Sequence, residues 1–587
     1  MTARLSVRAI AEAVNARASS ARAQAEQALA RIAAYDEIQP QTWIARAAAA
    51  GVLAQADAVD ARIARGERLA LAGVPFAAKD NFDAAGMATT AGCPAYAYEP
   101  PRDAEVVRRL LAAGAILLGK TNLDQFATGL VGARSPYGAC GCVFNRDYVS
   151  GGSSSGSAVA TGAGLVAFAL GTDTAGSGRV PAAFNHLVGL KPTKGRWSTS
   201  GLVPACRSLD CVTVFTNDAG DAALLDSVLA GFDAADPFSR PAQPYAPPAA
   251  WRIGWPRADQ LAWFGDGESE ALFAAARERF ARLGALVEID IAPLLAAAKL
   301  LYGGAWVAER TAALGPLLRS NPNAVHPVVR AIVEGGKAFS AVDAFNDSYA
   351  LKAYERAAES MWARIDTLVL PTAATIYRIA EVLAEPVALN ANLGAYTNFV
   401  NLLDMSAVAM PAGFRANGTG FGVTLIAPAH ADRALLQLAA VYEDLMTETP
   451  PPLDLAPRAP TIQLAVVGAH LAGMPLHWQL SSRNARLVRA CKTANAYKLY
   501  AMANSTPPKP ALVHVGAEGA ALEVEVYELD AAAFGTFVAE VPAPLAIGAV
   551  TLEDGAQVKG FVAEPRALDG ATDITHFGGW RAYIAAL

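Results

Sequence analysis

The stretch that decides the fold spans residues 151–193, and it contains Gly151-Gly152-Ser153-Ser154-Ser155-Gly156-Ser157 and Gly171-Thr172-Asp173-Thr174-Ala175-Gly176-Ser177-Gly178-Arg179. Both segments read as turns of small residues that present serines, and the apolar run 158–170 lies between them. Because glycine has no Cβ, backbone N–H groups can gather around a ligand at such turns, and a serine among them can be a nucleophile with its own oxyanion hole. The alternative is that these segments are loops or linkers. Their position among apolar segments favours a catalytic turn.

The composition is that of a folded globular protein. The 587 residues are 53% apolar and 17% charged, which allows a sizeable core and argues against global disorder. A net charge of −6 gives no reason to expect nucleic acid as a partner, and no basic run indicates a membrane surface. The N-terminus lacks a signal-peptide pattern, and the run 158–170 is too short to span a bilayer. We expect a cytoplasmic protein.

Cysteine usage points the same way. Six cysteines in a chain of this length are typical of a reduced, cytosolic protein. Cys140 and Cys142 have no second pair at a metal-ligand spacing, so we interpret them as structural. We expect neither a metal nor a cofactor.

Helix and strand patterns alternate through the first part of the chain. Residues 5–66 are rich in alanine and carry apolar residues at helical spacing, which predicts helices. The apolar run 71–81 predicts a buried strand with Lys79 near its end, followed by a helix over 104–111, a strand over 115–118 and a turn over 119–122. This alternation predicts an α/β sandwich around a mostly buried sheet.

The pattern continues to a proline-rich segment. We expect strands at 251–255, 366–372 and 421–427, a long helical region over about 269–365 with breaks near Gly284 and Asn321, and a helix over 433–445. Five prolines within 449–460 can neither continue a helix nor join a central strand, so we place a linker there. The predicted domains are therefore 1–448 and 461–587. Strands are expected in the second domain at 463–467, 511–515, 522–529, 548–552 and 558–562.

A serine nucleophile needs a base, and two kinds are available. His186 follows Ser177 by nine residues, but a histidine with apolar neighbours is typically a core or hydrogen-bonded residue, so a Ser-His-Asp triad is unsupported. Lys79 ends an apolar strand, where desolvation would lower its pKa and allow a neutral amine to accept a proton. The alternative is a lysine that is solvated or paired with Asp80.

Four motifs together resemble the amidase signature family. They are Lys79-Asp80-Asn81 with Thr89-Thr90-Ala91-Gly92, then Gly152-Ser153-Ser154-Ser155-Gly156-Ser157, then Gly171-Thr172-Asp173-Thr174-Ala175-Gly176-Ser177, and Gly189-Leu190-Lys191-Pro192-Thr193. The resemblance covers about residues 5–445. It implies an α/β/α sandwich with a central mixed β-sheet covered by helices, and a Ser-cisSer-Lys triad.

The resemblance gives each triad residue a role. Ser177 is the nucleophile, Ser153 is a bridging serine on a cis peptide bond, and Lys79 is the base. Ser153 takes the proton of Ser177 and passes its own to Lys79, which later returns a proton to the leaving amine.

The resemblance also implies an oxyanion hole beside the nucleophile. A structural pair of Asp173 and Arg179 would shape this turn. The hole would consist of the backbone N–H groups of Thr174, Ala175, Gly176 and Ser177, with Ala175 where the family commonly has glycine.

A narrower resemblance, to the allophanate hydrolases of this family, concerns the substrate. It lies in segments 178–185, 196–206 and 208–210, and in the second domain from 467–471 to 577–583. It implies hydrolysis of allophanate, a urea with a carboxylate on one nitrogen. The products would be ammonia and N-carboxycarbamate, which decarboxylates to further ammonia and carbon dioxide.

The same resemblance implies the substrate contacts. Tyr302 and Arg310 match a carboxylate-binding pair, and eight residues of helix would place them on one face. The alternative is a surface arginine paired with Glu309 or another helix neighbour. Backbone near Ala127 would hold the substrate amide.

The second domain resembles the γ-glutamyl cyclotransferase-like fold, a small α+β barrel. His470 is the residue we associate with a second step, decarboxylation of the first product. The alternative is that this domain only dimerises or docks partners.

Two other functions stay open. One is a different amidase, acting on biuret or general amides, or an amidotransferase subunit, which would lack the second domain. The other is an assembly component that docks on an upstream enzyme through the second domain. We expect a homodimer that acts on a small molecule, with no nucleic-acid or membrane partner.

Overall fold

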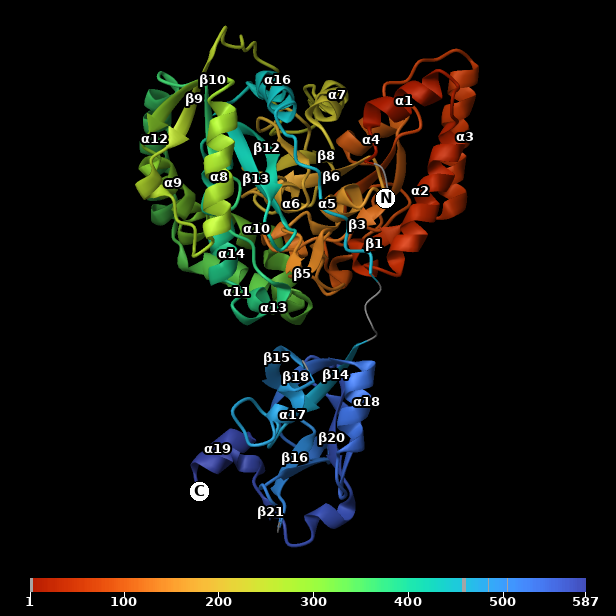
Figure 1. Cartoon of the computed structure of the whole chain (residues 1–587), viewed down its shortest axis with the longest axis vertical. Helices are drawn as coiled ribbons and strands as arrows, with labels where there is room; N and C mark the ends of the chain where they lie inside the picture. Colours follow the sequence, from red (N-terminus) through yellow and green to blue (C-terminus); the bar gives the residue numbers. More distant parts are fainter. Residues whose placement is uncertain (1–3, 457–460, 484, 504) are drawn as a thin grey trace. The chain divides into compact units, whose positions relative to one another are not determined.

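The structure is a computed structural model that describes residues 4–456, 461–483, 485–503 and 505–587. It divides into two compact units, Met1–Ala456 and Pro457–Leu587 (Figure 1). Of the linker predicted at 449–460, residues 457–460 lie outside the described residues.

A mixed sheet of eleven strands lies at the centre of the first unit, within residues 4–456. Its order is β1-β3-β2-β6-β8-β7-β12-β13-β11-β9-β10. Strand β2 is parallel to both of its neighbours, β3 and β6, whereas β6 is antiparallel to β8. The strands are β1 (Trp43–Arg46), β2 (Pro75–Lys79), β3 (Ile116–Thr121), β6 (Phe168–Asp173), β7 (Val188–Lys191), β8 (Cys211–Thr216), β9 (Trp251–Pro256), β10 (Gly284–Ile289), β11 (Thr367–Pro371), β12 (Met405–Phe414) and β13 (Gly420–Pro428).

Helices cover the sheet. Figure 1 shows α2 and α3 beside the β1 end and α9 and α12 beside the β9–β10 end. This mixed sheet under helices confirms the predicted α/β fold. The helices are α1 (Val7–Asn15), α2 (Ala21–Asp36), α3 (Ala49–Ala64), α4 (Glu105–Ala112), α5 (Ser155–Gly162), α6 (Val180–Phe184), α7 (Ala219–Leu229), α8 (Gly267–Phe280), α9 (Ala292–Gly303), α10 (Trp306–Ser320), α11 (Pro327–Gly335), α12 (Ala341–Trp362), α13 (Ile379–Ala384), α14 (Ala388–Leu393), α15 (Phe399–Leu402) and α16 (Asp432–Glu443).

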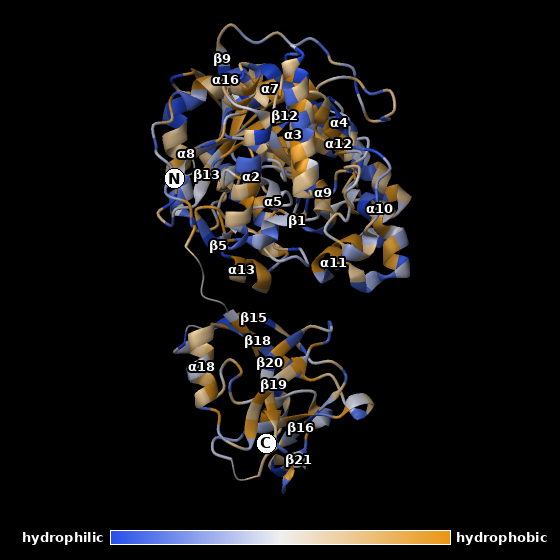
Figure 2. Ribbon diagram, turned by 90° about the vertical axis from the view of Figure 1, so that its right-hand side faces the viewer, coloured by the Kyte–Doolittle hydropathy of each residue, from blue (hydrophilic) through white to orange (hydrophobic). Residues whose placement is uncertain are grey.

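The central strands are buried along their whole length. Every residue of β2, β3 and β6 is buried, and the rings of Phe76 and Phe168 stack 5.2 Å apart on neighbouring strands. A sheet with helices on both faces needs such near-continuous apolar strands. Apolar residues accordingly dominate the interior in Figure 2. The few polar groups that these strands carry are therefore exceptional, and Lys79 is one of them.

Several element predictions for this unit were wrong. Residues 5–66 are not helical throughout, because β1 occupies Trp43–Arg46, and β3 runs on to Thr121 through the predicted turn 119–122. The helical region 269–365 contains strand β10. Strands β6, β7, β8 and β12 were not predicted, and β6 includes residues 171–173 of a predicted turn. Short edge strands such as β1 and β10 bury few residues, so their sequences carry little alternation.

The end of the first unit is attached to its body. The amide of Asp454 donates to the Val143 carbonyl (2.8 Å), and the Arg146 guanidinium donates to the Ala456 carbonyl. Residues 454–456 of the proline-rich segment therefore belong structurally to the first unit.

The second unit is built on a five-stranded sheet of order β15-β18-β14-β20-β19. An isolated bridge pairs Thr493 with Leu552, the residues that follow the edge strands β15 and β19. Closure of this sheet into the predicted barrel stays a prediction. A three-stranded sheet, β17-β16-β21, accompanies it. The elements are β14 (Thr461–Val466), α17 (Trp478–Ser481), β15 (Arg486–Lys492), β16 (Tyr497–Ala501), β17 (Pro510–His514), β18 (Glu523–Asp530), α18 (Ala531–Ala539), β19 (Leu545–Thr551), β20 (Gln557–Ala563), β21 (Thr572–Asp573) and α19 (Trp580–Ala585).

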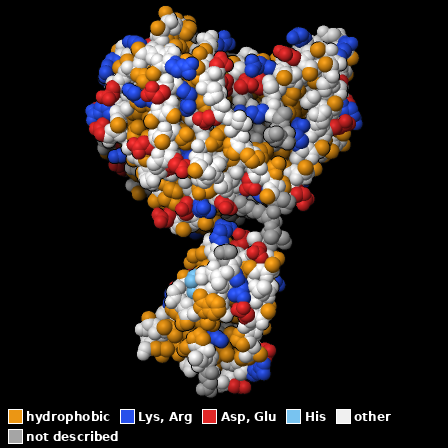
Figure 3. Space-filling view, viewed as in Figure 1, with side chains coloured by type: hydrophobic (Ala, Val, Ile, Leu, Met, Phe, Trp, Pro, Cys, Tyr) orange, Lys and Arg blue, Asp and Glu red, His pale blue; other side chains and the backbone are white. Residues whose placement is uncertain are grey.

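The surface is of mixed charge. Acidic and basic side chains are interspersed over the face of the first unit that Figure 3 shows. Among the described residues, no helix has both the length and the apolar character needed to cross a bilayer.

Candidate active site

Neighbouring strands β2 and β6 bring the predicted base toward the predicted nucleophile turn. Lys79 is the last residue of β2, and Asp173, the last residue of β6, leads directly into the turn with Ser177. Because the two strands are parallel, their carboxyl ends lie at the same edge of the sheet.

Lys79 is fully buried and contacts two hydroxyls. Its Nζ lies 2.8 Å from Ser153 Oγ and 2.7 Å from Thr172 Oγ1. Burial lowers the pKa of Lys79 to about 7, although the charges of Asp124, Asp210 and Asp173 oppose this shift. The amine is therefore available in its neutral form near neutrality, as a general base requires.

Ser153 lies at a fixed bend before helix α5. The peptide bond between Gly152 and Ser153 is cis. A Cβ on Gly152 would lie 2.2 Å from Asp124 Oδ2, so only glycine fits there. The Ser154 hydroxyl donates to the Thr172 carbonyl (3.2 Å), which ties this bend to strand β6.

Ser177 is buried at the start of the turn that leads to α6. Its Oγ donates to the Gly129 carbonyl, 3.5 Å away. Within the described residues no hydrogen bond joins the hydroxyls of Ser153 and Ser177. The structure thus pairs Lys79 with Ser153 directly, and the second link of the predicted relay stays a prediction.

The Asp173 carboxylate holds the turn together. It accepts hydrogen bonds from the amides of Gly176 (2.8 Å) and Gly178 (3.1 Å) and from Arg179 Nε (2.8 Å). The predicted structural pair of Asp173 and Arg179 is therefore confirmed. Gly176 has φ +136° and its Cβ position lies 2.4 Å from Thr397 Oγ1, so this residue must be glycine.

The four predicted oxyanion donors are not equivalent. The Gly176 amide is already engaged by Asp173. Within the described part of the chain, the amides of Thr174, Ala175 and Ser177 have no protein acceptor. These three N–H groups belong to buried residues of the turn with Ser177, so they are candidates to bind an anionic oxygen.

Tyr302 and Arg310 meet, although not on one helix as predicted. The helical stretch is interrupted after Gly303, so Tyr302 lies on α9 and Arg310 lies on the separate helix α10. Arg310 is 1% exposed, and its Nη2 donates to Tyr302 Oη (3.2 Å) with the guanidinium 5.1 Å from the ring centroid. Its Nη1 donates to Thr128 Oγ1 (3.0 Å), and its Nε has no hydrogen-bond partner.

The alternative pairing of Arg310 with Glu309 is not present among the described residues. The Glu309 carboxylate instead accepts from Cys206 Sγ and Ser208. A buried guanidinium with an unused donor suits a ligand carboxylate, because a charge removed from water needs an opposite charge.

Ala127 lies in a strained turn, η3 (Gln125–Ala127). Phe126 and Ala127 have φ values of +51° and +52°. Non-glycine residues adopt this region at a cost and persist there where surroundings enforce it. The next residue, Thr128, contacts Arg310, so the Ala127 backbone lies near the Tyr302–Arg310 pair.

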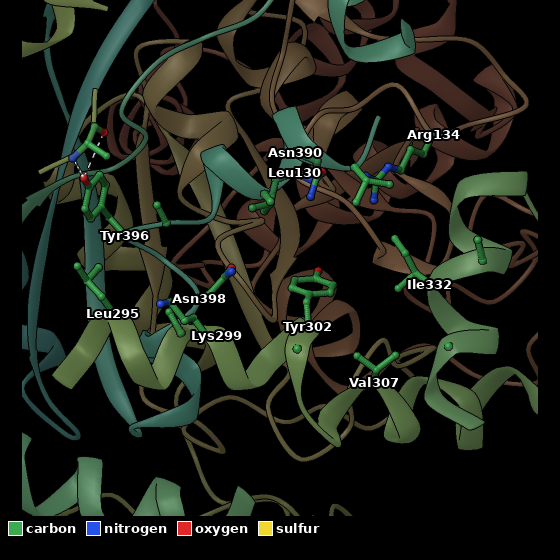
Figure 4. Close-up of a pocket in the computed structure, with 18 of the residues that line it drawn as sticks. Leu130, Arg134, Leu295, Lys299, Tyr302, Val307, Ile332, Asn390, Tyr396 and Asn398 are labelled. Atoms are coloured by element: carbon green, nitrogen blue, oxygen red, sulfur yellow. Dashed lines mark hydrogen bonds between the residues drawn. The ribbon is translucent and has the colours of Figure 1, made fainter. Parts of the chain in front are cut away.

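A cavity of about 730 Å³ borders Tyr302. Most of its helical lining comes from α9, with further residues from α11 and α14, and Figure 4 shows the Tyr302 ring directed into it, with Arg134 and Ile332 among the other lining residues. Leu130 also lines the cavity and follows Gly129, the residue that contacts Ser177. Lys79, Ser153, Ser177 and Arg310 are not among its lining residues, so the cavity borders the candidate site only through Tyr302 and Leu130.

His186 does not belong to this site. His186 is buried and stacks on Phe414 at 4.4 Å, and burial lowers its pKa to about 3, which confirms it as a core residue. His470, in the second unit, stacks on Phe561, and its Nε2 lies 2.7 Å from Gln479 Oε1. Burial lowers the pKa of His470.

Sequence reasoning did not assign a role to Thr172 or Thr128. Both are neighbours of segments already singled out, since Thr172 belongs to the 171–177 motif and Thr128 follows Ala127. Proximity in the chain was the only available signal, because their contacts with Lys79 and Arg310 span more than 90 residues.

The Amidase family matches residues 25–436, well over half of the chain. The chain belongs to the amidase family. It is thus an amidohydrolase by membership, and the resemblance found in the sequence is confirmed. The Allophanate hydrolase C-terminal domain family matches residues 462–585.

Individual relatives agree with both matches. The chain is 45% identical over 551 residues to urea amidolyase of Saccharomyces cerevisiae, covering 89% of this chain and 30% of that protein. It thus spans about 30% of the length of the curated urea amidolyases it matches. SeMet-substituted Kluyveromyces lactis allophanate hydrolase shares 41% identity and a TM-score of 0.70 over 97% of both chains. One glutamyl-tRNA(Gln) amidotransferase subunit, from Cupriavidus pinatubonensis, is 35% identical, over 75% of this chain and 96% of its own length.

Proposed function

We propose that this amidase hydrolyses allophanate through Lys79, Ser153 and Ser177. The observation that carries the proposal is the buried Arg310, stacked on Tyr302 with its Nε unpaired, beside an amidase site. Similarity to K. lactis allophanate hydrolase over 97% of both chains and the matched C-terminal domain support it. The amidotransferase subunit, by contrast, corresponds to only 75% of this chain.

The proposed reaction begins with the substrate carboxylate against Arg310 and Tyr302 and the ureido amide near Ala127. Ser177 attacks the terminal carbonyl while Ser153 accepts its proton and gives its own to Lys79. The oxyanion binds the free amides of Thr174, Ala175 and Ser177. Lys79 then protonates the leaving nitrogen through the same relay, and ammonia departs.

Water completes the turnover. It attacks the carbamoyl-type acyl-enzyme, restores the Ser177 hydroxyl and releases N-carboxycarbamate, which decarboxylates to ammonia and carbon dioxide. For the second unit we propose a role in this decarboxylation through His470, with docking or dimerisation as the alternative. We also propose that the protein is a cytoplasmic homodimer. We propose further that it works with an upstream urea-consuming enzyme, since the urea amidolyase relatives are longer proteins.

Ammonia release from purified protein tests the proposal. Ser177→Ala should abolish it, whereas Ser227→Ala on α7 serves as a matched control and should not. Full activity of Ser177→Ala would refute the mechanism. Assays with allophanate, biuret, malonamate and glutamine decide between allophanate and the other amidase substrates.

Arg310→Leu tests the substrate. It should raise KM for allophanate at least tenfold and leave the KM of a small neutral amide unchanged, because only the carboxylate needs the guanidinium. Equal effects on both substrates would remove Arg310 from substrate binding. Deletion of residues 461–587, followed by measurement of mass, turnover and product, tests the roles proposed for the second unit.

A further inference from the structure

The loop over residues 205–210 lies between the oxyanion turn and helix α10. On one side, the buried Asp210 carboxylate accepts a hydrogen bond from Thr174 Oγ1, so it holds the first residue of the oxyanion turn. Asp210 also accepts the amides of Ala205 (2.9 Å) and Cys206 (3.2 Å). The loop thus closes around the carboxylate that binds Thr174.

On the other side, the loop is bound by Glu309 of α10. The Glu309 carboxylate accepts the Cys206 thiol (2.9 Å) and both the amide and the hydroxyl of Ser208 (2.7 Å each). Burial raises the pKa of the Cys206 thiol well above its ordinary value, so this thiol is protonated and acts as a donor. Glu309 directly precedes Arg310, whose side chain faces Tyr302 and Thr128.

Cys206 contacts both carboxylates, Asp210 and Glu309. Its amide donates to Asp210 and its thiol donates to Glu309. A continuous chain of hydrogen bonds therefore runs from α10 through Glu309, Cys206 and Asp210 to Thr174 in the oxyanion turn.

We propose that Cys206 and Glu309 are positioning residues that fix the oxyanion turn to the helix carrying the carboxylate-binding arginine. This inference rests on the proposed function, since it assumes that the turn with Thr174 stabilises the oxyanion. The physical reason is that oxyanion donors act only when they are already oriented, so the support of Thr174 matters as much as its N–H. The bridge serves acylation of any substrate, whereas Arg310 serves carboxylates only.

This difference sets the experiment. Two acyl donors are compared, allophanate and the neutral ester p-nitrophenyl acetate, with Ser177→Ala as the blank. Glu309→Ala and Cys206→Ala should each lower kcat about tenfold on both, since one poorly oriented donor is sufficient for such a loss. Cys206→Ser keeps a donor and should recover most of the rate, and exposed Glu334→Gln on α11 is the matched control.

The outcomes separate the roles. A loss confined to allophanate would overturn the proposal, because Glu309 would then act only through Arg310. Unchanged rates on both donors would also overturn it. If the alanine variants fail to fold, Glu309→Gln and Cys206→Ser replace them. The proposal is contradicted if Glu309→Gln hydrolyses both acyl donors at the wild-type rate.

The double variant gives a second, independent readout. If Glu309 and Cys206 act as one bridge, Glu309→Ala combined with Cys206→Ala should lose about as much rate as either change alone. Additive losses would show two unconnected sites and refute the bridge. Failure of the proposed function is distinguishable, because it would appear as activity in Ser177→Ala irrespective of these variants.

Discussion

The state of Lys79 gives a quantitative prediction for the pH dependence of the reaction. An ordinary lysine, with a pKa of 10.5, is neutral in roughly one molecule in 3,000 at pH 7. Burial beside Ser153 and Thr172 lowers the pKa of Lys79 to about 7, so about half of the molecules carry the neutral base at that pH. The protein environment thus raises the concentration of active base about a thousandfold.

The assay is kcat/KM for ammonia release from allophanate between pH 5.5 and 9.5. Below about pH 7, log(kcat/KM) should rise by one per pH unit, because one proton must leave Lys79 before Ser153 can transfer its own. Above about pH 7, kcat/KM should level off. A rate that is flat over this range, or one that still rises at pH 9.5, would refute Lys79 as a base with this pKa.

A charge variant sharpens the test. Asp210 is one of the carboxylates that raise the pKa of Lys79. Asp210→Asn should therefore shift the acid limb, the pH range in which kcat/KM rises, to lower pH. Asp57→Asn, which removes an exposed carboxylate on α3, is the control and should leave the limb in place. A shift to higher pH in Asp210→Asn would contradict the electrostatic argument.

Three further predictions concern stability and geometry. The pKa of Lys79 is about 7 in the folded protein and 10.5 in the unfolded chain, so the wild-type protein loses stability as pH falls from about 10.5 to about 7. Lys79→Met should therefore be inactive, yet its free energy of unfolding at pH 7 should exceed that of the wild type by a few kcal/mol. Above pH 10.5 the variant should show no such gain, and chemical denaturation at both pH values measures the difference. Gly176→Ala places a methyl 2.4 Å from Thr397 Oγ1 at φ +136°, so kcat should fall at least a hundredfold, and wild-type kcat would disprove the turn geometry. Thr172→Val removes one of two hydroxyls at Lys79 Nζ and should lower kcat about tenfold, with Thr172→Ser restoring it; a loss in both variants would point to packing instead.

Part of the fold was predictable because several strands are apolar. The buried runs that became β2, β9, β11 and β13 are each at the expected place, since a strand buried on both faces needs a continuous apolar sequence. The equally buried β6, β7, β8 and β12 were missed. β1 and β10 lie at the two edges of the sheet and bury less, and β1 is in an alanine-rich segment that favours helix. Their sequences therefore gave no strand signal.

The candidate catalytic residues could be identified to the extent that motifs contain them. The position of Lys79 at the end of an apolar strand left a desolvated base and a solvated or ion-paired lysine both open, and the family resemblance supplied the role of base. The engagement of the Gly176 amide by Asp173 could not be predicted, because backbone hydrogen bonds of a turn depend on its dihedral angles. Nor could the partners of Glu309, since Cys206 and Ser208 lie about 100 residues away in the chain. Spacing within a helix identifies neighbours on that helix only.

The position of α9 and α10 in the chain order has a consequence for how substrate choice is encoded. Lys79, Ser153 and Ser177 lie on and around β2 and β6, inside the sheet, whereas Tyr302 and Arg310 lie on the connection between β10 and β11, toward the other end of the strand order. The residues proposed for the chemistry therefore lie in a different stretch of sequence from the Tyr302–Arg310 pair, although Thr128, which contacts Arg310, belongs to the first stretch. Exchange of residues 290–366 between relatives would replace the Tyr302–Arg310 pair and leave β2, β6 and the turn with Ser177 unaltered.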